Sequence, residues 1–313
     1  MKLHSIAKAA VALSLLAAPC PAQERRAASD YFNHGVSLYQ KGDFEGAIAD
    51  FTKAIEISSR LDNRGHANDW RDKTGAASNF DKVRVLDPQA AAAYANRGLA
   101  RYQLRDYDGA IADCDRAIAI NPRLNDAYNN RGIARYALKD YGRAIADFDR
   151  AIAIDPRDVE TYNNRGNVYM DKEDLDRALA DFDKALAIDP RRTAIYFNRG
   201  FARRRKGDDD GALKDFDKAI ALAPNLASGY YGRGVALCDK NDLNRAINAF
   251  NRAIELDPRY ALAYGNRGLA LLRQGKDAEA EKDIERAVAL RPELRAELES
   301  YVEQTKKWRQ PNR

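Results

Sequence analysis

The sequence predicts an all-α protein built as a solenoid of helical hairpins. The first observation is a recurring glycine, in the tripeptide Asn-Arg-Gly or a close variant, at Gly35, Gly65, Gly98, Gly132, Gly166, Gly200, Gly234 and Gly268. The last five intervals between these glycines are each 34 residues. The second observation is that an alanine and a proline follow each glycine from Gly98 onward at fixed distances. Such a period is typical of units that cannot bury their own apolar face and therefore stack.

One unit shows why a helical hairpin is expected. Residues 91–104 and 108–120 both carry apolar side chains at helical spacing, separated by a short polar turn. Glycine inside a helix costs about 1 kcal/mol relative to alanine. Its recurrence therefore predicts a close approach of two antiparallel helices at Gly98 and Ala110. Pro122 is predicted to end the second helix, because proline lacks an amide donor and restricts the residue before it.

These positions resemble the tetratricopeptide repeat family. Its pattern is an aromatic residue, a glycine four residues later, then alanine, an aromatic residue, alanine and a terminal proline. One unit matches it with Tyr128, Gly132, Ala144, Phe148, Ala151 and Pro156. The resemblance covers residues 28–292 as eight repeats, of which the second, about 58–90, is degenerate. It implies a right-handed superhelical solenoid whose first helices line a concave groove.

The N-terminal segment has the pattern of a secretory signal. Residues 1–22 begin with basic residues, continue with an apolar run too short to cross a bilayer, and end with small residues. We therefore expect cleavage after Ala22, a linker over residues 23–27, and an exported chain that is periplasmic or secreted. Two alternatives stay open, which are an uncleaved anchor and lipidation at Cys20.

The C-terminal residues 293–313 are expected to form a capping helix and a short tail. Leu294, Leu298 and Tyr301 would share one face of this helix. A terminal helix with a polar outer side is what a solenoid needs at its exposed end.

Composition excludes several classes of function. The 52 Lys and Arg are intermixed with 47 Asp and Glu, without the one-sided excess of nucleic-acid-binding proteins. No other apolar run is long enough to span a membrane. After the signal only His34 and His66 remain, and neither lies at metal-ligand spacing from cysteines or carboxylates. Aspartate pairs such as Asp147 and Asp149 recur with the repeat, whereas a catalytic pair would be singular. We expect no metal, no cofactor and no enzymatic activity.

An arginine replaces the leucine that the family has before the repeat glycine. It occurs in seven units, at Arg64, Arg97, Arg131, Arg165, Arg199, Arg233 and Arg267, and His34 takes its place in the first. With the hairpin turn near Asp106, antiparallel geometry places Arg97 beside Asp113. The same offset pairs Arg131 with Asp147, Arg165 with Asp181 and Arg199 with Asp215. Because an unpaired buried charge is costly, we predict a structural ladder of ion pairs.

An asparagine ladder precedes these arginines, at Asn33, Asn63, Asn96, Asn130, Asn164, Asn198 and Asn266, and is interrupted by Gly232. It is similar to the asparagine ladder of O-linked N-acetylglucosamine transferase, where the side chains hold the backbone of an extended peptide. A carboxamide both donates and accepts, so it can pair with any peptide unit. Alternatively, the asparagines bond to neighbouring repeats and hold the superhelical pitch.

The candidate peptide-binding residues are therefore Asn96, Asn130, Asn164, Asn198 and Asn266, with Asn129, Asn163, Asn167, Arg204 and Arg205 at variable positions around them. The basic run Arg203–Lys206 either meets an acidic segment or complements the end of its own helix. The resemblance implies a non-catalytic scaffold that binds a protein or an extended peptide in its groove. The alternative is a structural or assembly factor of an envelope complex that uses the convex face or the ends.

Overall fold

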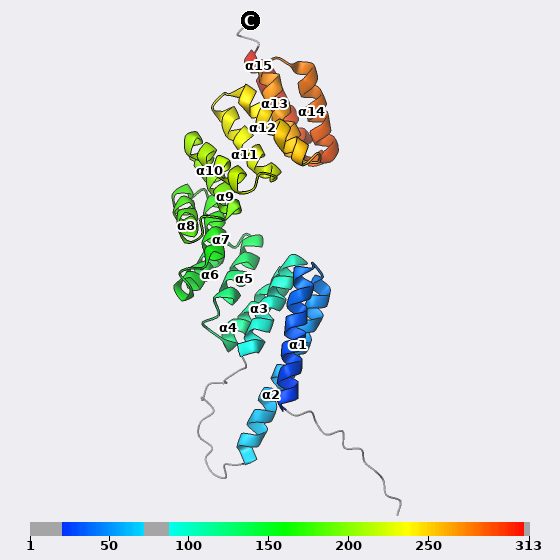
Figure 1. The fold of residues 1–313 in the computed structure, drawn as a ribbon, viewed down its shortest axis with the longest axis vertical. Coiled ribbons are helices and arrows are strands. Elements are labelled where there is room, and N and C mark those ends of the chain that lie inside the picture. Colours follow the sequence, from blue (N-terminus) through cyan, green and yellow to red (C-terminus); the bar gives the residue numbers. More distant parts are fainter. Residues whose placement is uncertain (1–20, 72–87, 310–313) are drawn as a thin grey trace, which may run out of the picture. The chain divides into compact units, whose positions relative to one another are not determined.

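The computed structural model describes residues 21–71 and 88–309, and the secondary structure of these residues is entirely helical (Figure 1). They fall into two compact units, Met1–Arg131 and Gly132–Arg313, which are described separately. Unit 1 contains α1 (Pro21–Gln40), α2 (Phe44–Arg71), α3 (Pro88–Gln103), α4 (Tyr107–Ile120) and the start of α5 (Asn125–Ala137). Unit 2 contains the rest of α5, then α6 (Tyr141–Ile154), α7 (Val159–Asp171), α8 (Leu175–Ile188), α9 (Thr193–Arg205), α10 (Asp209–Leu222), α11 (Ala227–Asp239), α12 (Leu243–Leu256), α13 (Ala261–Arg273), α14 (Asp277–Leu290), the 3-10 turn η1 (Pro292–Leu294) and α15 (Arg295–Arg309).

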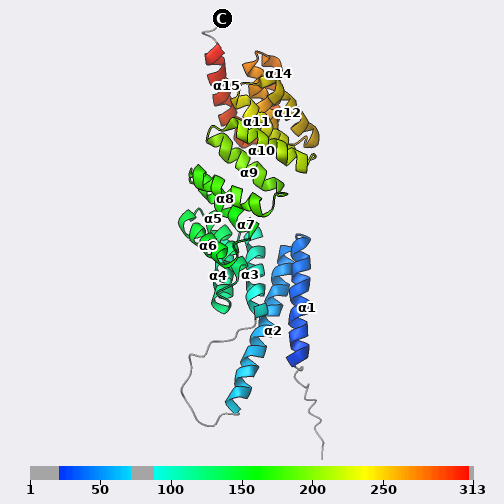
Figure 2. The same cartoon turned by 60° about the vertical axis from the view of Figure 1, so that its left-hand side comes forward.

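Consecutive helices pair into hairpins, as Figure 2 shows for α9 with α10 and α11 with α12. The second helices α2, α6, α8, α10 and α12 also pack against the next first helix, for example α8 against α9 and α10 against α11. The first helices α7, α9, α11 and α13 are neighbours in turn. The all-α solenoid of helical hairpins predicted from the sequence is therefore confirmed.

A phenylalanine of the second helix fills the centre of most hairpins. Phe51, Phe148, Phe182, Phe216 and Phe250 are at most 1% exposed. The ring of Phe216 lies so close to Gly200 that a Cβ there would be 2.8 Å from Cε1. In the α3–α4 hairpin Cys114 replaces the phenylalanine. There a Cβ on Gly98 would be 3.0 Å from the carbonyl oxygen of Ala110, which confirms the predicted close approach.

Short polar signals set the ends of the helices. The carboxylate of Asp208 accepts a hydrogen bond from the Gly211 amide at 2.9 Å and caps α10. The turn before this cap needs a positive φ, which Gly207 supplies at 84° and Lys139 adopts at 61° in the α5–α6 turn. Asn121, which precedes a proline, is extended and ends α4, as predicted.

The structure differs from the sequence prediction in the first two repeats. The expected boundary near residue 58 is absent, because α2 runs without a break from Phe44 to Arg71. The physical reason is visible in the sequence: Ser59 stands where later repeats carry the terminal proline, so nothing stops the helix. Residues 72–87, the remainder of the expected second repeat, lie outside the described residues. Residues 23–27, expected as a linker, form part of α1, and residues 1–20 of the expected signal also lie outside the described residues.

The predicted C-terminal helix is present as α15. Leu298 is 6% exposed and packs with Ala287 and Val288 of α14. Tyr301, however, is 47% exposed, and Val302 packs instead against Leu272 and its neighbours. Leu294 and Leu298 thus lie on one packed face, as predicted, but Tyr301 does not. Val302 takes its place because it lies four positions after Leu298, on the same side of the helix.

Candidate binding surface on the first helices

Buried aspartates on the second helices hold the arginines that precede the repeat glycine. Arg97 donates from Nε and Nη2 to the two carboxylate oxygens of Asp113, at 2.8 and 2.6 Å. Three further pairs share this geometry, which are Arg165–Asp181, Arg199–Asp215 and Arg267–Asp283. The predicted ladder is confirmed for the first three pairs, and Arg267 extends it. The predicted pairing of Arg131 with Asp147 involves residues of different units and stays a prediction.

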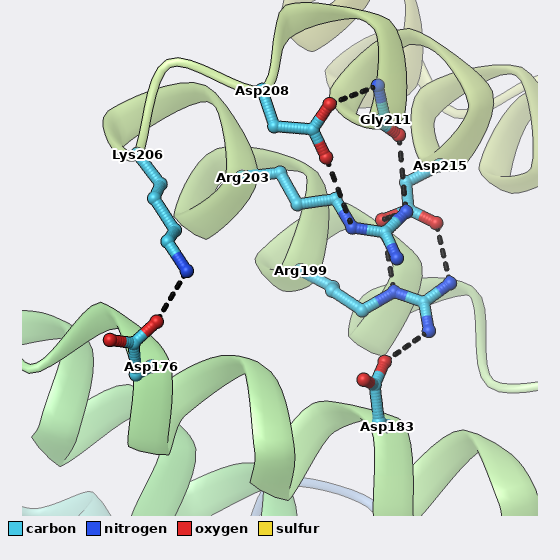
Figure 3. A network of polar contacts seen from close by, with 8 residues as sticks. All are labelled: Asp176, Asp183, Arg199, Arg203, Lys206, Asp208, Gly211 and Asp215. Carbon is cyan, nitrogen blue, oxygen red and sulfur yellow. Dashed lines mark hydrogen bonds and ion pairs between the residues drawn. The ribbon is translucent and has the colours of Figure 1, made fainter.

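Each of these arginines in unit 2 also reaches the second helix of the preceding repeat. Arg199 Nη1 donates to Asp183 Oδ1 at 2.6 Å (Figure 3), and Arg165 Nη1 donates to Asp149 Oδ1 at 2.5 Å. Equivalent contacts join Arg233 to Asp217 and Arg267 to Asn251, and in unit 1 Arg131 to Asp115. One guanidinium therefore links a repeat both to its own second helix and to its predecessor. This second contact was not predicted, although the recurring Asp-x-Asp pairs are its signal in the sequence.

Two repeats depart from this arrangement for simple reasons. Residue 249 is alanine rather than aspartate, so Arg233 has no carboxylate at the inner position and contacts Asp217 at 2.9 Å. In the first repeat His34 replaces the arginine and pairs through Nδ1 with Asp50. The ladder thus begins with a histidine and is incomplete in the repeat of α11.

Burial and ion pairing act in opposite directions on these guanidinium groups. Removal from water lowers the pKa of Arg165, but the hydrogen bonds and charges of Asp181 and Asp149 raise it by more. The net pKa therefore lies above its ordinary value, and Arg199 behaves in the same way. Pairing on two sides in this manner offsets the cost of removing the guanidinium charge from water. We interpret the ladder as structural.

The basic run Arg203–Lys206 is likewise paired with carboxylates of three repeats. Arg203 Nη1 lies 3.0 Å from Asp215 Oδ2 in its own repeat, and Lys206 pairs with Asp176 in the preceding one (Figure 3). The remaining two arginines, both candidate binding residues, pair as Arg204–Asp239 and Arg205–Glu173. An acidic ligand would have to compete with these internal partners.

Polar side chains join successive first helices at residues 35 positions apart. Asn198 Nδ2 donates to Asn163 Oδ1 at 2.9 Å, and Asn266 Nδ2 lies 3.4 Å from the hydroxyl of Tyr231. In unit 1, Asn130 Nδ2 donates to the Ala95 carbonyl at 3.2 Å. Arg205 and Arg273 also reach back 35 residues, to the carbonyls of Met170 and Cys238. The repeat is 34 residues long, so a side chain that reaches back 35 residues contacts the residue just before the equivalent position of the preceding repeat. These asparagines thus bond between repeats, as one of the two interpretations expected.

The asparagine side chains nevertheless keep hydrogen-bonding capacity. A carboxamide has two N–H donors and one acceptor oxygen. Among the described residues, half-buried Asn198 uses one donor, on Asn163, so its second donor and its oxygen remain available. Asn167 Oδ1 is buried and has no hydrogen-bond partner within the described part of the chain. The other candidates, Asn96, Asn129 and Asn164, are half-buried on α3, α5 and α7.

An aromatic cluster continues this surface over α9 and α11. The rings of Phe197 and Phe201 lie 4.7 Å apart, and Phe201 and Tyr231 lie 6.4 Å apart. Burial raises the pKa of the Tyr231 hydroxyl, so this ring stays neutral. The asparagine row is interrupted at Gly232 because the ring of Phe216 fills that space: a Cβ there would lie 2.4 Å from Cε1.

The described residues offer no cluster of three or more histidines, cysteines or carboxylates with the geometry of a metal site. Over the same residues, no helix combines the length and apolar character needed to cross a bilayer.

Sequence profiles of the tetratricopeptide repeat match residues 31–60, 91–124, 134–172, 159–192, 193–226, 234–275 and 261–294. The matches cover most of the chain, and the chain belongs to the tetratricopeptide repeat family. This repeat is a module for protein–protein interaction and is typically non-catalytic. None of the curated proteins gives a significant match.

Solved structures show the same fold. A tetratricopeptide repeat protein from Parabacteroides merdae is 18% identical, covers 88% of this chain and 99% of its own, and superposes with a TM-score of 0.62. PilF of Pseudomonas aeruginosa is 19% identical, with coverage of 68% and 97% and a TM-score of 0.59. YrrB, described as a protein with an unusual peptide-binding site, is 24% identical with coverage of 62% and 97%. Its TM-score is 0.49.

Proposed function

We propose that this chain is a non-catalytic scaffold that holds an extended segment of a partner protein along its first helices. In unit 2 the binding surface would consist of α7, α9, α11 and α13, and we refer to it as the first-helix surface. The function rests on recognition of the partner's backbone by asparagine side chains, with selectivity from the aromatic cluster of Phe197, Phe201 and Tyr231.

The observation that carries this proposal is the hydrogen bond between Asn198 and Asn163 at 2.9 Å. The bond fixes the orientation of the Asn198 carboxamide before any ligand arrives, which reduces the ordering cost of binding. The remaining donor and the oxygen of Asn198 can then serve one peptide unit of a ligand. The two interpretations of the ladder thus combine, because the same side chain bridges repeats and presents polar groups.

A comparison of two triple variants tests the proposal. The first replaces three asparagines of the first-helix surface, as Asn164→Ala, Asn198→Ala and Asn266→Ala. The matched control replaces three exposed residues of second helices that share the 34-residue spacing, as Arg150→Ala, Lys184→Ala and Lys218→Ala. Both variants must keep the helicity of the parent, measured by circular dichroism. Each protein is used to capture partners from a native extract.

The proposal expects a partner that binds the parent and the control but is lost from the asparagine variant. If all three proteins capture the same partners equally, the first-helix surface is not the binding site. Loss from the control alone would instead favour the alternative, an assembly factor that uses its convex face.

We also propose that the chain is exported and cleaved after Ala22. The support is the basic, apolar and small-residue pattern of residues 1–22. Mass spectrometry of the protein purified from its natural source should give Gln23 as the first residue. A lipid-modified Cys20 would replace this proposal with membrane anchoring, and a retained N-terminus would contradict export by cleavage.

A further inference from the structure

A groove of about 880 Å³ lies between α14 and α15, away from the first-helix surface. The second helices α8, α10 and α12 each pack along the next first helix, which is α9, α11 and α13 respectively. Among the described helices, α15 packs instead mainly against α13. One side of α14 therefore faces the groove rather than a following helix.

The groove combines an apolar lining with acidic borders. Its apolar lining consists of half-buried Ile284 and Val302, together with Leu272 and Val288, which are 2% and 8% exposed. Its borders carry five acidic residues at one-turn spacing, which are Asp277, Glu281 and Glu285 on α14 and Glu299 and Glu303 on α15. Two basic residues, Arg295 and Lys306, also line it.

The two basic residues that line the groove form no ion pair with Glu281 or Glu285 of α14. Arg295 lies 3.6 Å from Glu299 on its own helix, and Glu303 pairs at 2.8 Å with Lys307, which lies outside the groove lining. Glu281 and Glu285 are exposed and have no cationic partner within the described residues. The carboxylates of the groove that can attract a cation without breaking an existing ion pair are therefore Glu281 and Glu285 on α14.

We propose that this groove binds an amphipathic helix of a partner protein, with an aliphatic stripe and basic residues on both flanks. A helix laid into an apolar groove is a common mode of recognition, in which the stripe supplies most of the binding free energy. The acidic borders would select lysine or arginine at one-turn spacing and fix the orientation of the helix. This site extends the proposed function, because it uses the last two helices rather than the first-helix surface.

A pair of synthetic peptides tests this proposal on the full chain. The first is a fluorescein-labelled helical peptide of about five turns with leucine along one stripe and lysine on both flanks. The second has the same leucine stripe with glutamate in place of lysine. Fluorescence anisotropy should show saturable binding of the lysine peptide, at least about tenfold tighter than the glutamate peptide.

Charge reversal in the groove provides the matched test. The variant Glu281→Lys with Glu285→Lys should bind the lysine peptide at least about tenfold more weakly and the glutamate peptide more tightly than the parent does. The control, Glu279→Lys with Glu297→Lys, changes exposed residues of the same two helices that do not line the groove. Its affinities should stay close to those of the parent.

Three results would overturn the proposal. The first is that the lysine peptide fails to saturate the parent, and the second is that both charge variants lose affinity equally. The third is that sedimentation shows a dimer of the parent that the groove variant abolishes. The last result would mean that a second copy of the chain occupies the groove. The asparagine variant of the first-helix surface should bind the lysine peptide normally, so failure here is distinguishable from failure of the proposed function.

Discussion

The two carboxylates that hold Arg165 should differ widely in their effect on stability. Asp181 is the inner partner, with a side chain only 7% exposed, and it accepts two hydrogen bonds from Arg165 at 2.8 and 2.7 Å. Asp149 is the outer partner, and its side chain is 54% exposed. Both contacts are short, so burial rather than distance sets the expected difference.

Replacing Asp181 with alanine leaves the mostly buried guanidinium of Arg165 without its inner partner. Breaking a buried pair in this way costs about 3–5 kcal/mol in the free energy of unfolding. The Asp149→Ala variant removes a solvent-screened contact and should cost less than about 1 kcal/mol. A third variant, Arg165→Leu with Asp181→Ala, removes both charges and should recover most of the loss, since apolar replacement of a buried pair is often neutral.

Urea unfolding followed by circular dichroism measures these differences. Hydrogen exchange with mass spectrometry should locate the loss of protection in α7 and α8, because a repeat array can open locally. Equal losses for Asp181→Ala and Asp149→Ala would show that burial does not set the strength of these contacts. A double variant as unstable as Asp181→Ala would show that the unpaired guanidinium is not the cause of the loss.

Four further predictions concern single positions and are each measured by urea unfolding against the parent. Asp208→Ala removes the cap of α10 and should lower the free energy of unfolding by about 1 kcal/mol; no change would contradict the capping role. Lys139→Gly relieves the strain of a positive φ and should raise the free energy of unfolding by up to about 1 kcal/mol. A decrease in this free energy would contradict the expected relief. Gly232→Ala places a methyl group against the buried ring of Phe216 and should lower the free energy of unfolding by about 1–3 kcal/mol. An unchanged free energy would show that the ring can move. The pKa of the Cys238 thiol is raised to about 11, chiefly because burial disfavours the thiolate. The neutral thiol therefore contributes its full stability below the usual thiol pKa of 9.0, and this contribution, about 2–3 kcal/mol, is lost as the pH rises toward 11. Cys238→Ala should lose less stability than the parent between pH 9 and 11, and parallel losses would contradict this assignment.

The sequence predicted those features that one repeat determines by itself. The contact of Gly98 with Ala110 and the pairing of Arg97 with Asp113 follow from the position of the hairpin turn, because two antiparallel helices then have a fixed register. The end of α4 follows from the restriction that Pro122 places on the residue before it.

One interpretation expected the asparagines to bond to neighbouring repeats, but the exact partners, which depend on how one hairpin packs on the next, were not predicted. The contact of Asn198 with Asn163 joins equivalent regions of two repeats with a shift of one residue, which depends on the packing of successive first helices. The outer contact of Arg199 with Asp183 needs the same information. The continuous helix through Ser59 could have been recognised, since the missing proline is visible in the sequence.

Photo-crosslinking can show whether a partner lies along the first-helix surface. A benzophenone amino acid is placed at position 201, where Phe201 lies half-buried on α9, and in a second protein at position 184, where Lys184 is exposed on α8. In a native extract the probe at 201 should form a crosslinked partner and the probe at 184 should not. A partner crosslinked from position 184 and absent from position 201 would contradict binding along this surface and place it on the second helices.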